Sequence, residues 1–355
     1  MTVLQIVPSL PSKVCGVGDY AWLLAQALQK DWGIASRFLV ADPAWDGTVP
    51  GAIATTVPGR SASDWLRALT PALVGVDAVV LQYSGYGYSA KGAPLGLAQA
   101  LASATQRPRK VPVLTMFHEL FASGPWWSKA FWFQQIQKHV CRRFVKLSRQ
   151  RRTNRAAYAL WLQRQGGRDA SSVCTMPVFS NLGELSAPSV PSSREARLVL
   201  FQPPSAKTKQ GDAFWRSFEE VRKALAPDEV IVAGRVLSLP PGSEFTVKGK
   251  LSQEDASALL ASARYGFFDY YDSYLAKSGL FAAFASHGVA CILASPNDSS
   301  ADGLVAGQHY LKAQDAERLN GETMDTLAAS LHQWYRGHDL ATTARSLAEQ
   351  LRTCC

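Results

Sequence analysis

The feature that most constrains this chain is a regular alternation of short apolar runs and helix-like segments. Each run is rich in Val, Leu, Ile or Phe, which is typical of a buried strand. The intervening segments show the three-to-four-residue spacing of amphipathic helices. Strand–helix–strand units of this kind form parallel sheets that bind ligands beyond the carboxyl ends of their strands. The apolar runs lie at residues 3–8, 36–40, 78–81, 111–117, 198–201, 229–233, 245–247, 264–268 and 289–293.

A length of 355 residues exceeds one typical core and predicts two domains. The stretch SAPSVPSSREA at residues 186–196 is rich in Ser and Pro and has the composition of a linker. We therefore expect an N-terminal domain over residues 1–185 and a C-terminal domain over residues 197–355. The expected fold class is α/β, with two Rossmann-like domains whose parallel sheets face each other across a cleft, and with helices at the C-terminus.

Composition and cysteine usage narrow the class of protein. The apolar fraction of 47% is that of a folded globular protein. The six Cys are scattered singly apart from the terminal pair, and none has metal-ligand spacing, so we expect a reduced compartment and no metal site. The N-terminus lacks the charged start and long apolar core of a signal peptide, and no apolar run reaches the ~18 residues of a membrane span. The sequence predicts a cytoplasmic protein.

Charge is distributed unevenly along the chain. The net charge is +9, yet residues 1–180 hold about 20 Lys and Arg against about 8 Asp and Glu, which leaves the remainder slightly acidic. A basic first half beside a near-neutral second half indicates a polyanionic partner for the first half. No recognisable RNA- or DNA-binding module occurs, which disfavours nucleic acid.

Residues 128–147 have the clearest helical periodicity in the chain, which predicts a helix with one basic face and one apolar face. We expect Phe133, Ile136, Val140, Phe144 and Leu147 on the apolar face. The basic face includes Arg142, Arg143 and Lys146, aromatic residues lead into the helix, and Arg149, Arg151, Arg152 and Arg155 follow it. Such a helix can lie on the inner face of an anionic membrane, which would make the protein peripheral. The alternative is a surface helix with a solvated basic face.

The segment at residues 272–293 has the features of an anion site. Lys277, Ser278 and Gly279 precede a helix of small residues that ends near Gly288. A Gly at a helix start lets backbone N–H groups approach a ligand, and the helix dipole favours a phosphate there. The alternative is an ordinary loop-to-helix Gly beside a solvated Lys. Lys207 and Lys209, in the loop before another helix, have the same two interpretations.

Several polar residues follow apolar runs in the first half. His118 and Glu119 come directly after one run, and Tyr83, Tyr86 and Tyr88 after another. Residues at strand ends are placed to contact a ligand. The tyrosines could stack on acceptor sugars or simply line a loop, and His118 could instead be a core histidine.

These segments resemble the GT-B glycosyltransferases of the retaining family 4 (group 1) type, which build bacterial polysaccharides and lipid glycans. The resemblance covers nearly the whole chain and rests on the order and spacing of four stretches. They are CGVGDYAWLLAQAL, VLQYSGYGYSAKGAP, MFHELFASGPWWSKAFWFQQIQ and KGKLSQEDASALLASARYGFFDYYDSYLAKSGLFAAFASHGVACIL.

The resemblance implies a role for each matched position. His118, Lys207 and Lys209 would be catalytic. The donor and its phosphates would be bound by Gly16, Gly18, Gln202, Lys248, Gly249, Leu251, Lys277, Ser278 and Gly279. The sugar or acceptor would contact Glu119, Tyr83, Tyr86 and Asp272. The resemblance also implies that neither a metal nor a cofactor is needed. In such enzymes cationic side chains and a helix N-terminus stabilise the departing diphosphate.

One departure from the family pattern bears on the sugar. Many members carry two Glu before and within the last phosphate helix, and here Leu275 and Ala283 stand at those positions. The resemblance therefore predicts a retaining hexosyl transfer from a nucleotide diphosphate sugar to a lipid-linked or oligosaccharide acceptor, for surface glycan or lipopolysaccharide synthesis, without identifying the sugar.

Two other functions fit parts of the sequence. Gly16-x-Gly18-x-x-Ala21, with Asp42 further on, matches a dinucleotide fingerprint and would make the protein an NAD-dependent oxidoreductase. A seven-residue loop between strand and glycines disfavours this, because the fingerprint needs the strand to run directly into the glycines. The second alternative is a non-catalytic protein that binds a membrane surface through its basic helix.

Overall fold

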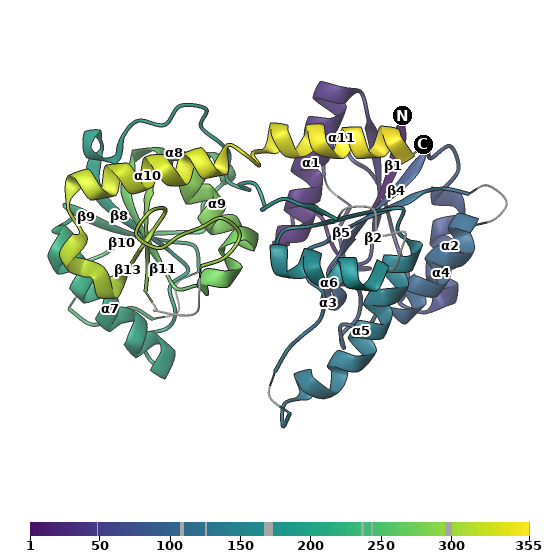
Figure 1. Cartoon of the computed structure of the whole chain (residues 1–355), viewed down its shortest axis with the longest axis horizontal. Helices are drawn as coiled ribbons and strands as arrows, with labels where there is room; N and C mark the ends of the chain where they lie inside the picture. The colour runs from purple at the N-terminus through teal and green to yellow at the C-terminus, as the bar shows by residue number, and fades with distance from the viewer. Residues whose placement is uncertain are drawn as a thin grey trace. The chain divides into compact units, whose positions relative to one another are not determined.

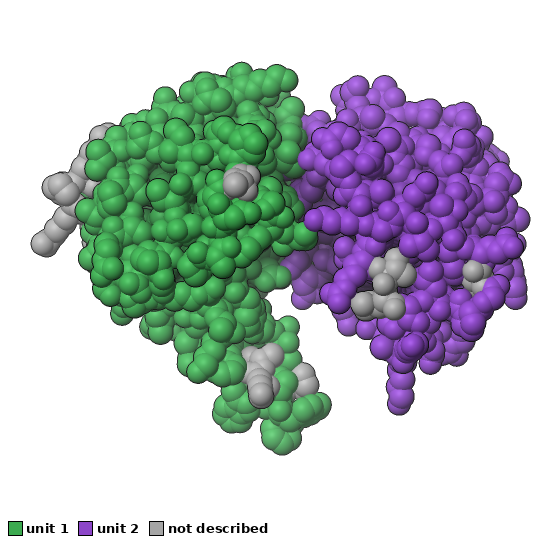
Figure 2. Space-filling model, turned by 180° about the vertical axis from the view of Figure 1, so that it is seen from behind, with its two compact units in different colours: residues 1–177, 340–355 green, residues 178–339 purple. Residues whose placement is uncertain are grey.

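The computed structural model describes residues 1–47, 49–106, 110–124, 126–166, 173–235, 238–242, 244–294 and 300–354. The chain forms two compact units (Figure 2). Unit 1 comprises residues 1–177 and 340–355, and unit 2 comprises residues 178–339. This division differs from the expected domains at residues 1–185 and 197–355, because the last helix returns to unit 1 and residues 186–196 lie within unit 2.

Unit 1 is a three-layer α/β unit built on a parallel sheet with the strand order β3-β2-β1-β4-β5-β6-β7 (Figure 1). Its strands are β1 Thr2–Val7, β2 Ala35–Val40, β3 Ile53–Thr56, β4 Ala78–Tyr83, β5 Val113–Phe117, β6 Gln150–Thr153 and β7 Cys174–Thr175. Its helices are α1 Gly16–Trp32, α2 Ala62–Ala72, α3 Gly85–Tyr88, α4 Leu95–Gln106, α5 Lys129–Leu147, α6 Ala156–Gly166 and α11 Leu340–Cys354.

Unit 2 repeats this design with a parallel sheet in the order β10-β9-β8-β11-β12-β13. Its strands are β8 Glu195–Phe201, β9 Glu229–Ala233, β10 Thr246–Gly249, β11 Ala263–Phe268, β12 Ala290–Leu293 and β13 Leu311–Lys312. The α-helices are α7 Lys209–Leu225, α8 Gln253–Ser262, α9 Gly279–Ser286 and α10 Gly321–Tyr335. The 3-10 helices are η2 Pro191–Ser193, η3 Asp272–Lys277 and η4 Ala313–Arg318. Both sheets confirm the predicted α/β class.

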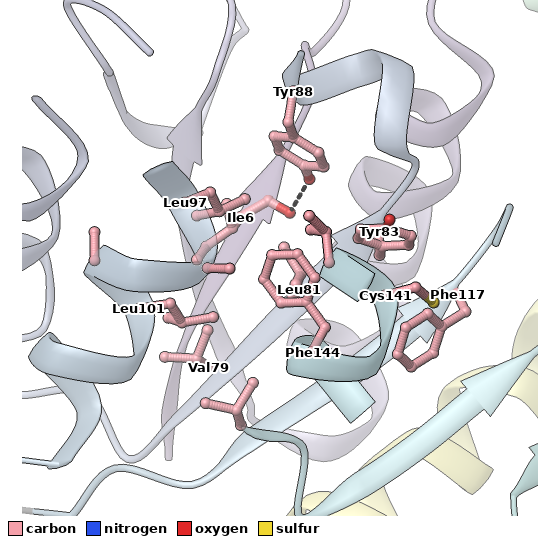
Figure 3. Packing of buried hydrophobic residues seen from close by; sticks show 14 of the residues in the cluster. Ile6, Val79, Leu81, Tyr83, Tyr88, Leu97, Leu101, Phe117, Cys141 and Phe144 are labelled. Carbon is pink, nitrogen blue, oxygen red and sulfur yellow. Dashed lines mark hydrogen bonds between the residues drawn. The ribbon is translucent and has the colours of Figure 1, made fainter. Parts of the chain in front are cut away.

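The core of unit 1 lies between the sheet and helices α2, α4 and α5 (Figure 3). Residues of β1 and β4 meet side chains of α4 and α5 there, so the apolar runs read from the sequence are the buried strands. The phenol of Tyr88 is buried in this core and its hydroxyl lies 2.9 Å from the Ile6 carbonyl oxygen. This contact joins the short helix α3 to the carboxyl-terminal part of β1.

Helix α11 closes unit 1 by packing along α1 (Figure 1). The Arg352 guanidinium carbon lies 5.1 Å from the centre of the Trp32 ring. Arg152 of β6 is almost fully buried and its Nη1 donates to Gln350 Oε1, at 2.6 Å, and to Ser346 Oγ, at 3.1 Å. A buried guanidinium requires such hydrogen-bond partners. The chain end therefore belongs to the core of the first unit.

The helix predicted at residues 128–147 is present as α5. Its buried face includes Gln137, Val140, Cys141 and Phe144, whereas the expected apolar residue Ile136 is 48% exposed. The prediction for Ile136 was wrong because this residue stands at the edge of the apolar sector, where one helical step separates the core from solvent. The basic residues Arg151, Arg152 and Arg155 are also buried rather than part of an exposed basic surface.

Candidate functional site

In unit 1, polar side chains gather where β1, β4 and β5 end. These strands are adjacent and parallel, so their carboxyl ends lie at the same edge of the sheet. The loop 8–15 follows β1, α3 follows β4, and His118 and Glu119 follow β5. The predicted positions Gly16, Gly18, His118 and Glu119 therefore come from segments that meet at one edge.

His118 is held by buried neighbours at this edge and is 6% exposed. Its Nε2 lies 2.8 Å from Gln82 Oε1, and its ring packs edge-on against Tyr20 with centroids 5.0 Å apart. The Asn154 amide donates to the His118 carbonyl oxygen at 3.4 Å. The imidazole is thus fixed in orientation, as a catalytic group must be.

A chain of buried amides sets the proton position on His118. Gln82 Nε2 donates to Gln5 Oε1 at 3.0 Å, and Gln5 Nε2 donates to Ser36 Oγ at 3.1 Å. With its nitrogen donating, Gln82 presents its oxygen to the imidazole, so Nε2 of His118 donates this hydrogen bond. Both glutamines are fully buried on β1 and β4. No local sequence pattern indicates this chain of contacts.

The two predicted glycines have different surroundings. Gly16 is exposed at the start of α1, and a Cβ there would meet no atom within 4 Å. A Cβ on Gly18 would lie 2.2 Å from the Ser9 carbonyl oxygen. Gly18 therefore lets α1 cross the loop after β1 at close range, and Gly16 leaves backbone accessible to a ligand.

Asp19, in the first turn of α1, is a further titratable group that the sequence did not single out. Burial raises the pKa of its carboxyl to about 6. A carboxyl with a raised pKa at the ligand-binding edge of a parallel sheet is a candidate for proton transfer. Its signal in the sequence was its place directly after Gly18, at the helix start.

Of the other residues of unit 1 predicted to contact the sugar or acceptor, Glu119 and Tyr86 lie at the carboxyl edge of the sheet and Tyr83 lies in the core. Ser84 Oγ donates to Glu119 Oε2 at 3.4 Å, which joins the loops after β4 and β5. Tyr86 is 50% exposed on α3, and its hydroxyl accepts from Gln137 at 3.1 Å. Tyr83 is fully buried against Phe117 and Phe144, so no face of its ring is available to an acceptor sugar. Only Tyr86 of this pair suits the expected role.

In unit 2, a pocket of about 260 Å³ opens where β8 and β11 end. These strands are neighbours in the sheet, and the chain leaves β8 toward β9 on one side and returns to β11 on the other. Such a switch in strand order is where parallel sheets bind ligands. The lining is contributed by Phe201, Gln202, Pro203, Pro204, Gln210, Phe214, Phe268, Asp269, Tyr270, Ser278 and Leu280.

Ser278 brings the start of α9 to this pocket. Its hydroxyl caps the helix by accepting from the Phe281 amide at 3.2 Å. A Cβ on Gly279 would meet only Asn181 Nδ2, at 3.7 Å, so the backbone is open there. Lys277 is half-buried, with its ammonium 5.6 Å from the Tyr274 ring. The predicted phosphate segment thus lies beside the pocket.

Helix α7 also begins at this pocket, which Gln210 of its first turn lines. Thr208 caps it by accepting from the Gly211 amide at 3.0 Å. Lys207 and Lys209 are exposed, and their ammonium groups have no hydrogen bond or ion pair with the described residues. Gln210 Nε2 donates to Asp269 Oδ2 at 3.2 Å. Gln210 and Asp269 extend the predicted set with an amide and a carboxylate inside the pocket.

Asp272 occupies a buried position that does not suit contact with a sugar. Its side chain is fully buried, and Oδ2 lies 2.7 Å from Lys312 Nζ and accepts from the Tyr310 hydroxyl at 2.9 Å. This ion pair ties η3 to the loop around β13. Asp272 therefore acts in the structure of unit 2, as the start of the turn that leads to Ser278.

Lys248 and Leu251 lie apart from Ser278 and Gln202. They line a second pocket, of about 400 Å³, with Arg197, Glu229 and Asp255. Arg197 and Glu229 stand at the starts of β8 and β9, whereas the first pocket opens at the strand ends. Gly249 ends β10 with a positive φ of 63°. Lys248 and Leu251 thus line a different pocket from Ser278, whereas the Gly249 carbonyl oxygen accepts from the amide of Gly234, the residue after β9.

Two broader findings concern metals and membranes. In the part of the chain that the structure describes, no group of three or more His, Cys, Asp or Glu side chains could hold a metal ion. Of the helices within the described ranges, none combines the length and the apolar character needed to cross a bilayer. Arg142, Arg143 and Lys146 are exposed on α5, as predicted.

Comparison with known proteins identifies the fold. No protein-family model matches the chain, and no curated protein sequence matches it. An α-glucosyltransferase solved with UDP and DNA is similar over 99% of this chain and 98% of its own, with TM-score 0.59 and 9% identity. The lipopolysaccharide outer core galactosyltransferase WaaB is similar over 99% and 100%, with TM-score 0.56 and 10% identity.

An epimerase shares this architecture. The UDP-GlcNAc 2-epimerase from Neisseria meningitidis, solved with UDP-GlcNAc, is similar over 99% of this chain and 100% of its own, with TM-score 0.54 and 10% identity. At such identities the likeness shows the fold alone. The chain has a GT-B-like fold of two Rossmann-like units, which confirms the predicted fold class and leaves the narrower family assignment a prediction.

Proposed function

We propose that the protein is a retaining glycosyltransferase that moves a hexosyl group from a nucleotide diphosphate sugar to a lipid-linked or oligosaccharide acceptor. The observation that carries this proposal is the pocket at the ends of β8 and β11, beside the start of α9. The solved structures with this fold include proteins bound to UDP and to UDP-GlcNAc, which supports a nucleotide-sugar ligand.

The donor diphosphate would bind where helices α7 and α9 begin. The Gly279 and Leu280 N–H groups, which have no carbonyl partner within the helix, and the positive end of the helix dipole favour a phosphate. Lys207, Lys209 and Lys277 would add the charge that neutralises the diphosphate as it departs. Inside the pocket, Asp269 and Gln210 offer a carboxylate and an amide, which suit sugar hydroxyls rather than phosphate oxygens.

The transfer step breaks the bond between the anomeric carbon and the diphosphate oxygen, and both electrons leave with the nucleoside diphosphate. A hydroxyl oxygen of the acceptor forms the new bond on the same face of the sugar. The hydroxyl proton passes to the departing phosphate. The charge that develops on the leaving group is what the lysines and the helix N-termini would stabilise.

Unit 1 would carry the acceptor side of the reaction. His118, held by Gln82 and Tyr20, would contact the bound sugar with an imidazole of fixed orientation. Glu119 would position the loop through Ser84, and the open backbone at Gly16 would allow close approach of a ligand. Exposed Arg142, Arg143 and Lys146 would hold this unit near an anionic membrane, where a lipid-linked acceptor resides.

The oxidoreductase alternative has weaker support. Gly18 lies inside α1 and faces the Ser9 carbonyl, rather than standing in the turn between strand and helix. Asp42, which would bind the ribose, instead forms an ion pair with Lys13 at 2.6 Å. Both residues that would recognise NAD thus have structural roles.

A turnover assay tests the proposal. The full chain is incubated with UDP-, GDP- and ADP-hexoses and a bacterial lipid extract, and products are identified by mass spectrometry and NMR. We expect one donor to be consumed with formation of a glycolipid that keeps the anomeric configuration. The double variant Lys207→Ala/Lys209→Ala should lose about 10²-fold in rate, and Lys223→Ala, at the far end of α7, should not. A donor epimerised at C2 without transfer would contradict the proposal.

A further inference from the structure

The loop before α5 and the first half of α5 expose an unusual set of large apolar side chains. Trp126, Trp127 and Trp132 are 68%, 71% and 69% exposed, and Phe131 and Ile136 are 36% and 48% exposed. The Trp126 and Trp127 rings pack edge-on against each other, as do those of Phe131 and Trp132. Side chains this large are rarely left exposed together without a partner.

Helical spacing puts the apolar and basic exposed residues of α5 on one face. Trp132, Ile136, His139, Arg143 and Lys146 follow one another at intervals of three or four residues, and all five are exposed. We call these five residues the α5 stripe. The far side of the helix packs Cys141 and Phe144 into the core. Intervals of three and four keep residues on a single side of a helix, so the stripe has an apolar first half and a cationic second half.

The stripe is presented on a supported element. Gln137 is buried beneath it, and its side chain accepts from the Ala122 amide at 2.8 Å and donates to the Lys91 carbonyl oxygen at 2.8 Å. These contacts fix α5 to the segments on either side. The first turns of α5 extend beyond the rest of unit 1 (Figure 1). The exposed tryptophans are therefore carried outward by a helix whose inner face is anchored.

We propose that the α5 stripe inserts Trp132 and Ile136 into the interfacial layer of an anionic bilayer, while Arg143 and Lys146 contact lipid headgroups. Trp126 and Trp127 enter the same layer from the preceding loop. The proposal deepens the membrane contact of the proposed function, and it does not depend on the transfer reaction. It adds insertion of apolar side chains to the electrostatic membrane binding that basic residues alone would provide.

The chemistry of the stripe favours a lipid surface over a protein partner. Tryptophan rings are enriched at membrane interfaces, because one edge is polar and the body is apolar. The sequence of α5 contains no Asp or Glu, so nothing on the helix repels an anionic surface. Basic residues near such a surface add electrostatic attraction, and an amphipathic helix adds the burial of its apolar face.

Vesicle binding tests the insertion. The full chain is sedimented with vesicles of phosphatidylglycerol and phosphatidylcholine, and with phosphatidylcholine alone. Trp132→Ser/Ile136→Ser should lower partitioning onto the anionic vesicles at least tenfold, and Arg143→Glu/Lys146→Glu should do the same. The matched control is Leu66→Ser/Arg67→Glu, on the exposed side of α2 in the same unit, which should bind as wild type does. Thermal unfolding checks that each variant is folded.

Four outcomes would overturn the proposal in distinguishable ways. If only the charge reversal weakens binding, the surface contact of the proposed function stands and the apolar insertion falls. If neither double variant changes partitioning, both fall. If the lipid-free protein sediments as a dimer that Trp132→Ser/Ile136→Ser dissociates, the stripe binds a second copy of this chain. Brominated lipid should quench wild-type tryptophan fluorescence more than that of the Trp132→Ser/Ile136→Ser variant, and equal quenching would also exclude insertion.

Discussion

Nε2 of His118 lies 2.8 Å from Oε1 of Gln82, and both side chains are buried at the carboxyl edge of the first sheet. The contact joins the residue after β5 to the last residue but one of β4, so the strand register itself places the imidazole. Because Gln82 also donates to Gln5, neither glutamine can rotate without losing a buried hydrogen bond. The sheet therefore fixes the orientation of the residue that we propose to be catalytic.

Replacing Gln82 by Leu should destabilise the chain by about 1–3 kcal/mol, because Gln5 Oε1 and His118 Nε2 would lose their buried partner. Activity should fall further than the lost folded fraction accounts for, since the imidazole would be free to turn. Denaturant unfolding and turnover on the same samples separate the two effects. Ser36→Ala, at the less buried end of the chain of amides, should cost less than about 1.5 kcal/mol. Equal costs at both positions would contradict this account.

Gly18→Ala should destabilise unit 1, because a Cβ there would lie 2.2 Å from the Ser9 carbonyl oxygen and the backbone must move. We expect a loss of about 1–3 kcal/mol, as for other overpacked sites. Gly16→Ala is the matched control, since a Cβ there meets no atom within 4 Å. It should unfold as wild type does and yet weaken ligand binding if Gly16 faces a ligand. A stable Gly18→Ala protein would exclude the close crossing of α1.

Asp272→Asn should cost about 3–5 kcal/mol, because it leaves the Lys312 ammonium without its buried counter-charge. The control is Asp42→Asn at the exposed pair with Lys13, which should cost no more than about 1 kcal/mol. Urea unfolding at neutral pH measures both. A small loss at Asp272 would show that the pair is solvated, and would restore this residue as a candidate for sugar contact.

Asp19 predicts a specific pH dependence of stability. Its carboxyl has a pKa of about 6 in the folded chain against an ordinary value of 3.8, so the folded chain holds a proton that the unfolded chain releases. The contribution of Asp19 to the free energy of unfolding therefore decreases as pH rises from about 4 to about 6, and it does not change further above that. The loss is at most about 3 kcal/mol at 1.36 kcal/mol per pKa unit, and partial exposure reduces it.

The substitution Asp19→Asn checks this sign. It should raise the free energy of unfolding relative to wild type at pH 7 and leave it nearly unchanged at pH 4. Denaturant unfolding at both pH values supplies the comparison. A variant that is less stable than wild type at pH 7 would mean that the carboxylate is favoured by its helix N-terminus rather than disfavoured by burial.

Local sequence pattern was sufficient to predict the long apolar strands and the long amphipathic helices of both units. Strands such as β4 and helices such as α5 follow from period and composition, because burial on both faces demands continuous apolar runs. β6 was missed because its sequence, QRRT, has the composition of a basic surface. Its Arg152 is buried by α11, nearly 200 residues later in the chain, and no local window contains that partner.

The site was predicted in part for the same reason. Ser278 and Gly279 could be proposed because a Gly at a helix start has a local signature, and Ser278 lines the pocket of unit 2. Asp272 was assigned to the sugar because its partners Tyr310 and Lys312 come from a distant segment. Gln82 and Gln5 were overlooked because each is a single polar residue within an apolar strand. Long-range partners thus decided which polar residues are structural and which remain open to a ligand.

The central claim is that unit 2 binds a nucleoside diphosphate where α7 and α9 begin. Calorimetric titration of the full chain with UDP, GDP, ADP and NAD, without added metal, tests it most directly. We expect saturable binding of one nucleoside diphosphate, at least tenfold weaker in Lys207→Ala/Lys209→Ala and unchanged in Lys223→Ala. Binding of NAD alone, or nucleotide binding that is indifferent to Lys207 and Lys209, would contradict the claim.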